Sequence, residues 1–304
     1  MNLMPTTERI EESAAWEMLK GAVDVHVHAG LSLFPRLYDD WELAKQAAKA
    51  GLAAVVLKAH EGSSVERAHV ADRYVAGIQV FGGVVLNHFV GGFNPYSVEL
   101  ALGLGGKIVW MPTIHAQNHL RYYGDAGYQE MAATIQLKYP VKPLRILDDS
   151  GRLLPEVIDI VKIVAERDAV LATGHLSLEE IGQLVPAARE LGVKRVVLNH
   201  PELPVSSLPL DFQLEMARLG VYIERSFLPT TEKWGRYPIS RTAEEIRRIG
   251  PERCLLETDL GEKDGLDPSE GLMRFCCGLF EAGIPWHWIR QMVAENPRQL
   301  LGMS

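Results

Sequence analysis

The chain has 304 residues, 47% hydrophobic and 23% charged, a composition typical of a soluble globular protein with a sizeable core. This length is large for one ordinary domain but usual for a single α/β barrel. The net charge of −8 argues against nucleic acid or another polyanion as a partner. The three cysteines form neither a disulfide framework nor a zinc-ribbon spacing, which favours a cytoplasmic location: Cys254, Cys276 and Cys277.

The N-terminal stretch predicts a short amphipathic helix over residues 8–20. It alternates polar and apolar residues and contains no continuous apolar run, so it does not read as a signal peptide. No later segment is long and apolar enough to span a bilayer, and we expect no membrane association.

A short apolar strand followed by a helix then recurs along the chain. The predicted strands cover residues 22–28, 53–57, 80–86, 107–111, 169–173, 195–198, 221–224 and 254–257. The predicted helices begin at Asp39/Asp40, Ser63/Ser64 and Asn94-Pro95, and further helices cover about 154–167, 178–191, 211–219, 241–249, 269–282 and 286–294.

Eight strands that alternate with helices, without a linker or a change of composition, predict a closed (β/α)8 TIM barrel that forms one domain over residues 1–304. An open doubly wound sheet is the alternative, and the first strand lacks the Gly-rich phosphate loop that would support it. One irregular stretch, at about 116–150, interrupts the series; loops of this length are usually functional or disordered, and we expect a lid over the barrel mouth.

Polar residues that can bind a metal or move a proton follow almost every predicted strand. Because strands alternate their faces, His26 and His28 should point to one side and Val25 and Val27 to the other. In a barrel the carboxyl ends of the strands meet at one mouth, where such enzymes place their active sites. The residues at these ends are His26, His28, Lys58, His60, His88, His115, His175, His200, Arg225 and Asp259.

Imidazole nitrogen and carboxylate oxygen are the ligands that zinc and similar divalent ions take in proteins. His26, His28, His175 and Asp259 would supply such a set from opposite sides of the mouth. His200 would join a second ion, or hold the substrate or the attacking water. The carboxylate of Asp259 would accept a proton from water whose pKa a bound ion has lowered.

The order of these motifs resembles the amidohydrolase superfamily of metal-dependent hydrolases. The similarity lies in Asp24-Val25-His26-Val27-His28, in single histidines that end the fifth and sixth strands, in Thr258-Asp259 and in the tail from Glu295 to Gly302. It covers nearly the whole chain and implies metal roles for His26, His28, His175, His200 and Asp259. Other segments resemble a poorly characterised branch, so the substrate does not carry over.

The resemblance implies hydrolysis of an amide, lactone or ester-like bond of a small molecule, with Asp259 as general base and His200 steadying the developing oxyanion. It implies one or two divalent ions, with zinc first and manganese, iron, cobalt or nickel as alternatives. A metal-dependent decarboxylase or lyase acting on a small carboxylic acid is the second hypothesis. A barrel that only binds a ligand and has lost catalysis is the third.

One departure from the family concerns the residue that bridges two ions. Many members use a carboxylated Lys or a Glu from the fourth strand, where this chain has His115, whereas Lys58 ends the second strand. Lys58 would either bridge once carboxylated or act as an ammonium that faces an anionic substrate. The second interpretation is preferred, because an unmodified Lys is the default and would have to lose its proton before ligating.

The remaining candidates are assigned to the substrate. His60, His88, His115 and Arg225 are expected to contact a small molecule, which the cations suggest is anionic. For His88 and His115, burial without a function is the competing interpretation. The sequence leaves the oligomeric state open, a homo-oligomer included.

Overall fold

Parallel strands form the centre of the protein. The computed structural model describes residues 15–17, 19–124, 135 and 138–303. The strands are β1 (Val23–Val27), β2 (Ala54–Leu57), β3 (Gln79–Phe81), β4 (Gly83–Val85), β5 (Ile108–Trp110), β6 (Val170–Ala172), β7 (Arg195–Leu198), β8 (Tyr222–Ser226) and β9 (Cys254–Glu257). They pair in the order β1-β2-β3 and β4-β5-β6-β7-β8-β9, and every pair is parallel.

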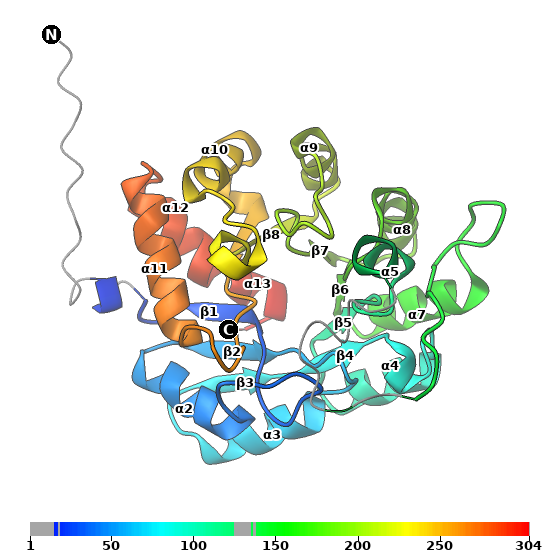
Figure 1. The fold of residues 1–304 in the computed structure, drawn as a ribbon, viewed down its shortest axis with the longest axis horizontal. Helices are drawn as coiled ribbons and strands as arrows, with labels where there is room; N and C mark the ends of the chain where they lie inside the picture. The colour runs from blue at the N-terminus through cyan, green and yellow to red at the C-terminus, as the bar shows by residue number, and fades with distance from the viewer. Residues whose placement is uncertain (1–14, 18, 125–134, 136–137, 304) are drawn as a thin grey trace, which may run out of the picture.

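Helices connect the strands and lie around their outer side (Figure 1). The α-helices are α2 (Asp40–Lys49), α3 (Val65–Tyr74), α4 (Pro95–Gly103), α5 (Gln117–Tyr123), α7 (Pro155–Glu166), α8 (Leu178–Glu190), α9 (Leu210–Arg218), α10 (Ile239–Ile249), α11 (Pro268–Glu281), α12 (Trp286–Arg290) and α13 (Asn296–Leu301). The short turns are η1 (His88–Val90), η2 (Leu228–Thr230), η3 (Glu232–Trp234), η4 (Pro251–Arg253) and the π-helical turn η5 (Gln291–Glu295).

The strands form the predicted TIM barrel. β3 and β4 are two halves of one barrel strand, separated at Gly82, so the third predicted strand is present but interrupted. Glycine is needed here because a Cβ on Gly83 would overlap the backbone of β5. The first and last strands meet at their carboxyl ends: Asp259 N–H donates to the His26 carbonyl at 2.9 Å, and His28 N–H donates to the Leu260 carbonyl at 2.8 Å. This contact closes the circle, so the open-sheet alternative does not apply.

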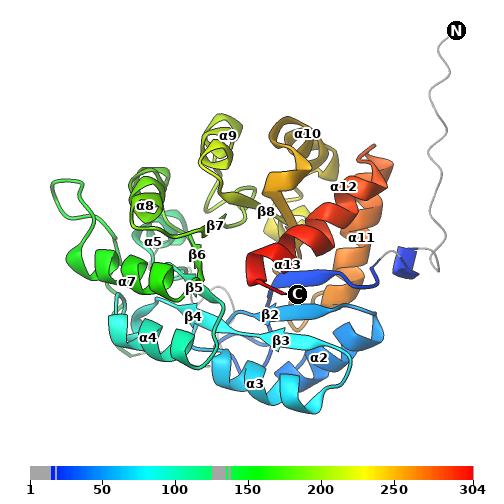
Figure 2. The ribbon, with the colours of Figure 1, turned by 180° about the vertical axis from the view of Figure 1, so that it is seen from behind.

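Two apolar clusters lie on the two sides of the barrel wall. The larger one joins the outward-facing strand residues to the helices, for example Val27 to Leu43 and Ala47 of α2. The smaller one fills the barrel interior and includes Leu300 and Leu301 of α13, which lies beside β1 (Figure 2). Its strand residues are Val23, Val25, Ala54, Val56, Val85, Ile108, Trp110, Val170, Ala172, Val197, Tyr222 and Leu255.

A β-bulge in β1 changes the predicted direction of one valine. Val23 pairs with Ala54, but Val27 pairs with Leu57, so β1 has one more residue than β2 between these pairs. Val25 packs in the interior cluster, on the same side as His26, while Val27 packs outward. The prediction that Val25 and Val27 share a face is therefore wrong, and the bulge is the reason. His26 and His28 do face the interior together.

The three helices predicted from capping signals begin where expected, although the Ser64 side chain before α3 makes no capping hydrogen bond. The Asp39 side chain accepts from Glu42 N–H in a capping box at the start of α2, and Asn94 caps α4 with Pro95 in its first turn. The stretch 116–150 is less irregular than expected, because α5 forms within it. Of the predicted lid at 116–150, residues 125–134 and 136–137 lie outside the described residues, and the lid stays a prediction. Among the described residues, no helix combines the length and apolar character needed to cross a bilayer.

Candidate metal centre

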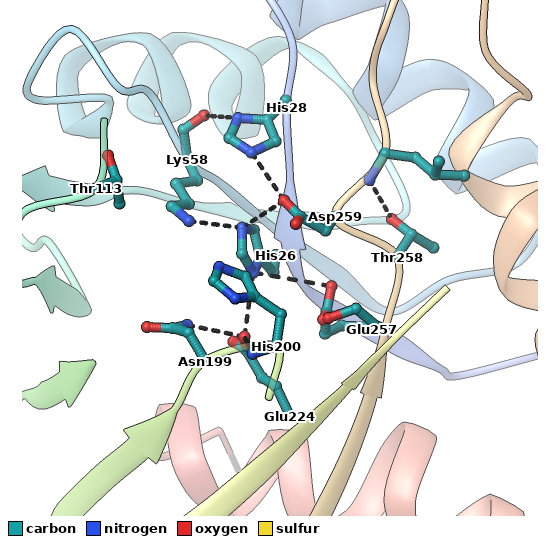
Figure 3. Close-up of polar contacts among 12 residues, drawn as sticks. His26, His28, Lys58, Thr113, Asn199, His200, Glu224, Glu257, Thr258 and Asp259 are labelled. Atoms are coloured by element: carbon teal, nitrogen blue, oxygen red, sulfur yellow. Dashed lines mark hydrogen bonds and ion pairs between the residues drawn. The ribbon is translucent and has the colours of Figure 1, made fainter. Parts of the chain in front are cut away.

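The carboxyl ends of the strands surround a cavity of about 280 Å³. Five of the predicted site residues line it: His28, Lys58, His60, His175 and Asp259. His26 and His200 lie next to this group, near Lys58 and Asp259 (Figure 3), and the centroids of their two rings are 5.8 Å apart. The structure therefore brings all five predicted metal ligands and Lys58 to one place.

Three side chains converge on one point at the base of this cavity. Asp259 Oδ1 lies 2.8 Å from His26 Nε2 and 3.0 Å from His28 Nε2. All three side chains are buried, and their ligand atoms lie close enough to share one metal ion. β1 supplies the two imidazoles, and the segment after β9 supplies the carboxylate across the closed barrel seam.

The tautomer of His28 directs a ring lone pair at this point. His28 Nδ1 faces the Lys58 carbonyl oxygen at 2.9 Å and must donate its proton there. Burial holds the pKa of His28 well below its usual value, so the ring is neutral and its Nε2 carries a lone pair. That lone pair faces a carboxylate oxygen of Asp259 at 3.0 Å, an arrangement of two acceptors that a positive ion between them would stabilise. The donor set thus fits a divalent metal.

His26 is oriented from behind by buried carboxylates. Its Nδ1 lies 3.3 Å from Glu224 Oε2 and 3.8 Å from Glu257 Oε2. Burial alone would lower the pKa of His26, but the negative charges of Asp259 and Glu224 outweigh burial and raise it. The ring of His26 is thus held between carboxylates, with Glu224 at Nδ1 and Asp259 at Nε2.

Two of the candidate ligands have left-handed backbone conformations. The φ angles are 23° at His200 and 53° at Asp259, values that are uncommon for residues other than glycine. Such conformations cost of the order of 1–3 kcal/mol and cluster at functional sites, where the surrounding structure enforces them. Asn199 already faces the interior, so the turn at His200 directs a second consecutive side chain to the mouth.

His200 and His175 are the two other predicted metal ligands, and they lie next to each other. Their ring centroids are 5.0 Å apart, and His200 Nε2 is buried without a hydrogen-bond partner. Burial lowers the pKa of His200 to about 4 and that of His175 well below its usual value. Both imidazoles are therefore neutral near pH 7, the form that binds metals.

His119 belongs to this site and was missed from the sequence. It projects from α5 into the cavity, 2% exposed, and its Nδ1 lies 2.7 Å from His175 Nδ1. Burial lowers the pKa of His119 to about 3. The only sequence signal was its position in the segment after the strand that ends near Trp110, because no periodicity marked α5.

Lys58 lies inside the site. It is 1% exposed, and its Nζ lies 2.8 Å from His26 Nε2. Burial lowers the pKa of its ammonium, against the opposing charges of Asp259, Glu224 and Glu257. Its Nζ is thus close both to the convergence point and to the cavity, as both interpretations of Lys58 require.

The predicted substrate residues separate into two groups. His60 lines the cavity, stacks on His28 with ring centroids 4.8 Å apart, and holds Thr113 Oγ1 at 2.9 Å through Nδ1. His88 and His115 pack against each other outside the cavity lining, and His88 Nε2 is exposed and bonded to the Lys142 carbonyl. The chain turns at η1, which begins at His88, and carries this side chain away from the mouth.

Arg225 does not reach the cavity. Its guanidinium is buried behind the barrel wall, 2.5 Å from Glu202 and 2.9 Å from Glu245. The reason is strand alternation: Tyr222 and Glu224 face inward, so Arg225 must face outward. The arginine that lines the cavity is instead Arg36, in the loop after β1, beside the lysines Lys58, Lys233 and Lys263.

Two buried carboxylates near His26 had not been assigned a role from the sequence. Glu224 is the inward neighbour of Arg225, and Glu257 ends β9 two residues before Asp259. Burial and the neighbouring carboxylates hold the pKa of Glu257 well above its usual range, whereas His26 lowers that of Glu224 despite burial. Both lie at positions where strand alternation directs the side chain into the barrel, and this alternation could have been read from the sequence.

Solved structures of low sequence identity share this fold. An amidohydrolase from Pseudomonas aeruginosa is 14% identical, with a TM-score of 0.63 over 95% of this chain and 99% of that chain. A probable dipeptidase from the same organism is 9% identical, with a TM-score of 0.63 over 95% and 96%. A 2,6-dihydroxybenzoate decarboxylase from Rhizobium is 13% identical, with a TM-score of 0.52 over 93% and 99%.

These similarities confirm the resemblance to the amidohydrolase superfamily at the level of the fold. No curated protein matches the chain. A family model described as "Family of unknown function (DUF6282)" matches residues 21–224, and the chain therefore belongs to the DUF6282 family.

Proposed function

We propose that this protein is a metal-dependent hydrolase that acts on an amide, lactone or ester-like bond of a small molecule. The observation that carries the proposal is the convergence of His26, His28 and Asp259 on one point at the base of the cavity. His28 Nδ1 donates its proton to the Lys58 carbonyl, so the lone pair on His28 Nε2 faces that point. Zinc is the first ion to test, because two imidazoles and a carboxylate suit it.

A bound divalent ion would lower the pKa of water at this point to near neutrality. Asp259 would accept the proton of the attacking water, because Oδ1 faces the two imidazoles and leaves Oδ2 as the base. His200 would steady the negative charge that develops on the substrate oxygen. His175 and His200 would hold a second ion if two are bound.

The substrate would lie in the cavity above this point. Four cationic side chains line its walls against three carboxylates: Arg36, Lys58, Lys233 and Lys263 against Asp259, Glu262 and Asp264. His60 adds a neutral imidazole. We therefore expect a small anionic molecule, in keeping with a volume of about 280 Å³. The same cations would also hold the carboxylate of a decarboxylase substrate, which makes decarboxylation the second hypothesis.

A cytoplasmic location remains a prediction.

Elemental analysis of the purified protein is the first test. We expect a stoichiometric divalent metal, and we expect its loss in His28→Ala and Asp259→Asn but not in His69→Ala, a control on the exposed surface of α3. The metal-loaded protein is then assayed with amides, lactones and esters in ¹⁸O-labelled water.

Label in the product supports hydrolysis, and released CO₂ from carboxylic acids supports the lyase. Binding of these ligands without either product supports a barrel that only binds. A protein that neither holds a divalent metal nor loses activity in both variants contradicts the whole proposal.

A further inference from the structure

One carboxylate oxygen of Glu224, beneath the site, lies within hydrogen-bond distance of three nitrogen atoms. Glu224 Oε2 lies 3.3 Å from His26 Nδ1, 2.8 Å from Asn199 Nδ2 and 3.3 Å from the His200 backbone N–H. Figure 3 shows the contacts of this oxygen with His26 and Asn199 at the centre of the site. Glu224 is 2% exposed, so water does not compete for these contacts.

Asn199 extends this connection to a third histidine. Its Oδ1 accepts from Gly174 N–H at 2.7 Å, immediately before His175. Gly174 has a φ of 57°, and a Cβ there would overlap the backbone of Met111 and Pro112, so this turn is tightly held. Asn199 thereby joins the carboxylate of Glu224 to the turn that carries His175.

We propose that Glu224 is the positioning residue of the metal centre. It fixes the ring of His26, the left-handed backbone of His200 and, through Asn199, the turn before His175. This inference rests on the proposed function, because positioning these side chains matters only if they bind a metal. Carboxylates that accept the second ring proton of a metal-binding histidine set its tautomer and orientation, and their loss typically weakens metal affinity by about 10–100-fold.

Glu257 is the matched comparison. It is buried at the same depth, but its nearer oxygen lies 3.8 Å from His26 Nδ1, and its other oxygen accepts from Ser226 Oγ. Although His26, Glu224 and Glu257 lie close enough to hold a cation, Glu224 Oε2 already faces two N–H donors besides His26. A positioning role therefore fits Glu224 better than a role as a ligand.

The test is a titration of the full chain, stripped with a chelator, with Zn²⁺ in competition with a chromophoric chelator. Glu224→Gln keeps the shape and removes the charge; Asn199→Ala cuts the link to Gly174; Glu257→Gln is the control. We expect about 10–100-fold weaker Zn²⁺ binding in Glu224→Gln, a smaller loss in Asn199→Ala and a change below about threefold in the control.

A second readout follows the proton on His26 Nδ1 in the zinc-loaded, ¹⁵N-histidine-labelled protein. Its resonance should lie far downfield in the wild type and in Glu257→Gln, and move upfield in Glu224→Gln, where a neutral amide replaces the carboxylate. If Glu224→Gln does not fold, Glu224→Asp takes its place, because it keeps the charge but withdraws it from His26.

The outcomes separate this inference from the function on which it rests. If Glu224→Gln binds Zn²⁺ within about threefold of the wild type, while His28→Ala loses binding, the inference is overturned and the proposed function stands. Equal losses in Glu224→Gln and Glu257→Gln also overturn it, because they would reflect burial of any carboxylate. If the wild type does not bind a divalent ion, the proposed function fails first.

Discussion

His28 Nε2 lies 3.0 Å from Asp259 Oδ1, and the proton that could join them is held on the other ring nitrogen by the Lys58 carbonyl. Where β1 meets the segment after β9, the lone pair on His28 Nε2 therefore faces the carboxylate of Asp259. A bound divalent ion would convert this repulsion into attraction between β1 and the segment after β9.

Zinc should consequently stabilise the fold. At one hundred times its dissociation constant, a ligand specific for the native state adds about 2.7 kcal/mol, which corresponds to a rise in Tm of about 5 °C for a chain of this size. Differential scanning calorimetry with Zn²⁺ and with EDTA measures the rise. Asp259→Asn should lose it and His69→Ala should keep it; an equal rise in Asp259→Asn would place the ion elsewhere.

Asp24 should make stability depend on pH. Burial raises the pKa of this carboxyl to about 6, although Thr258 Oγ1 donates to it at 2.6 Å. A carboxyl whose folded pKa exceeds its unfolded value favours the native state at low pH, and this contribution is lost as pH rises through about 6. Relative to the wild type, Asp24→Asn should therefore gain about 2–3 kcal/mol in free energy of unfolding between pH 4 and 8. Urea unfolding with EDTA present checks this, and a difference that does not change with pH would contradict it.

Gly261 should be intolerant of a side chain. Its φ is 141°, and a Cβ would overlap the His28 carbonyl across the seam. Gly261→Ala should cost at least about 2 kcal/mol in free energy of unfolding and weaken metal binding, because Asp259 must move with it. Gly103→Ala, in α4 with open space around it, should be neutral or stabilising by about 0.5–1 kcal/mol. Similar effects of the two substitutions on urea midpoints would show that the seam tolerates the movement.

The sequence predicted the barrel because each buried strand is short, apolar and followed by a helix, a local pattern that needs no tertiary contact to recognise. It predicted His26, His28 and Asp259 because their positions at strand ends imply a shared mouth. It did not predict the inward turn of Glu224 in place of Arg225, although alternation from Tyr222 implies it, because a charged pair gives no sign of which member faces the interior. The bulge at Val25 and the entry of His119 depend on pairing and packing between distant segments, which no local pattern encodes.

The two interpretations of Lys58, as an ammonium or as a metal ligand, predict opposite changes in Zn²⁺ affinity when the side chain is replaced. Its Nζ lies 2.8 Å from His26 Nε2, so an ammonium there repels a divalent ion bound to that nitrogen. Lys58→Met, which keeps the buried volume and removes the charge, should tighten Zn²⁺ binding by at least about tenfold at this distance, even in a partly screened site. It should also lower turnover, if Lys58 faces an anionic substrate.

A carboxylated Lys58 predicts the opposite result. Its loss would remove an oxygen ligand, weaken Zn²⁺ binding, and make the metal content of the wild type depend on added bicarbonate. Competition titrations of the wild type, Lys58→Met and the control Lys263→Met, an exposed residue of the same cavity wall, measure the sign. Tighter binding in Lys58→Met alone assigns the ammonium to the substrate side of the site, whereas weaker binding together with a bicarbonate requirement makes Lys58 part of the metal centre.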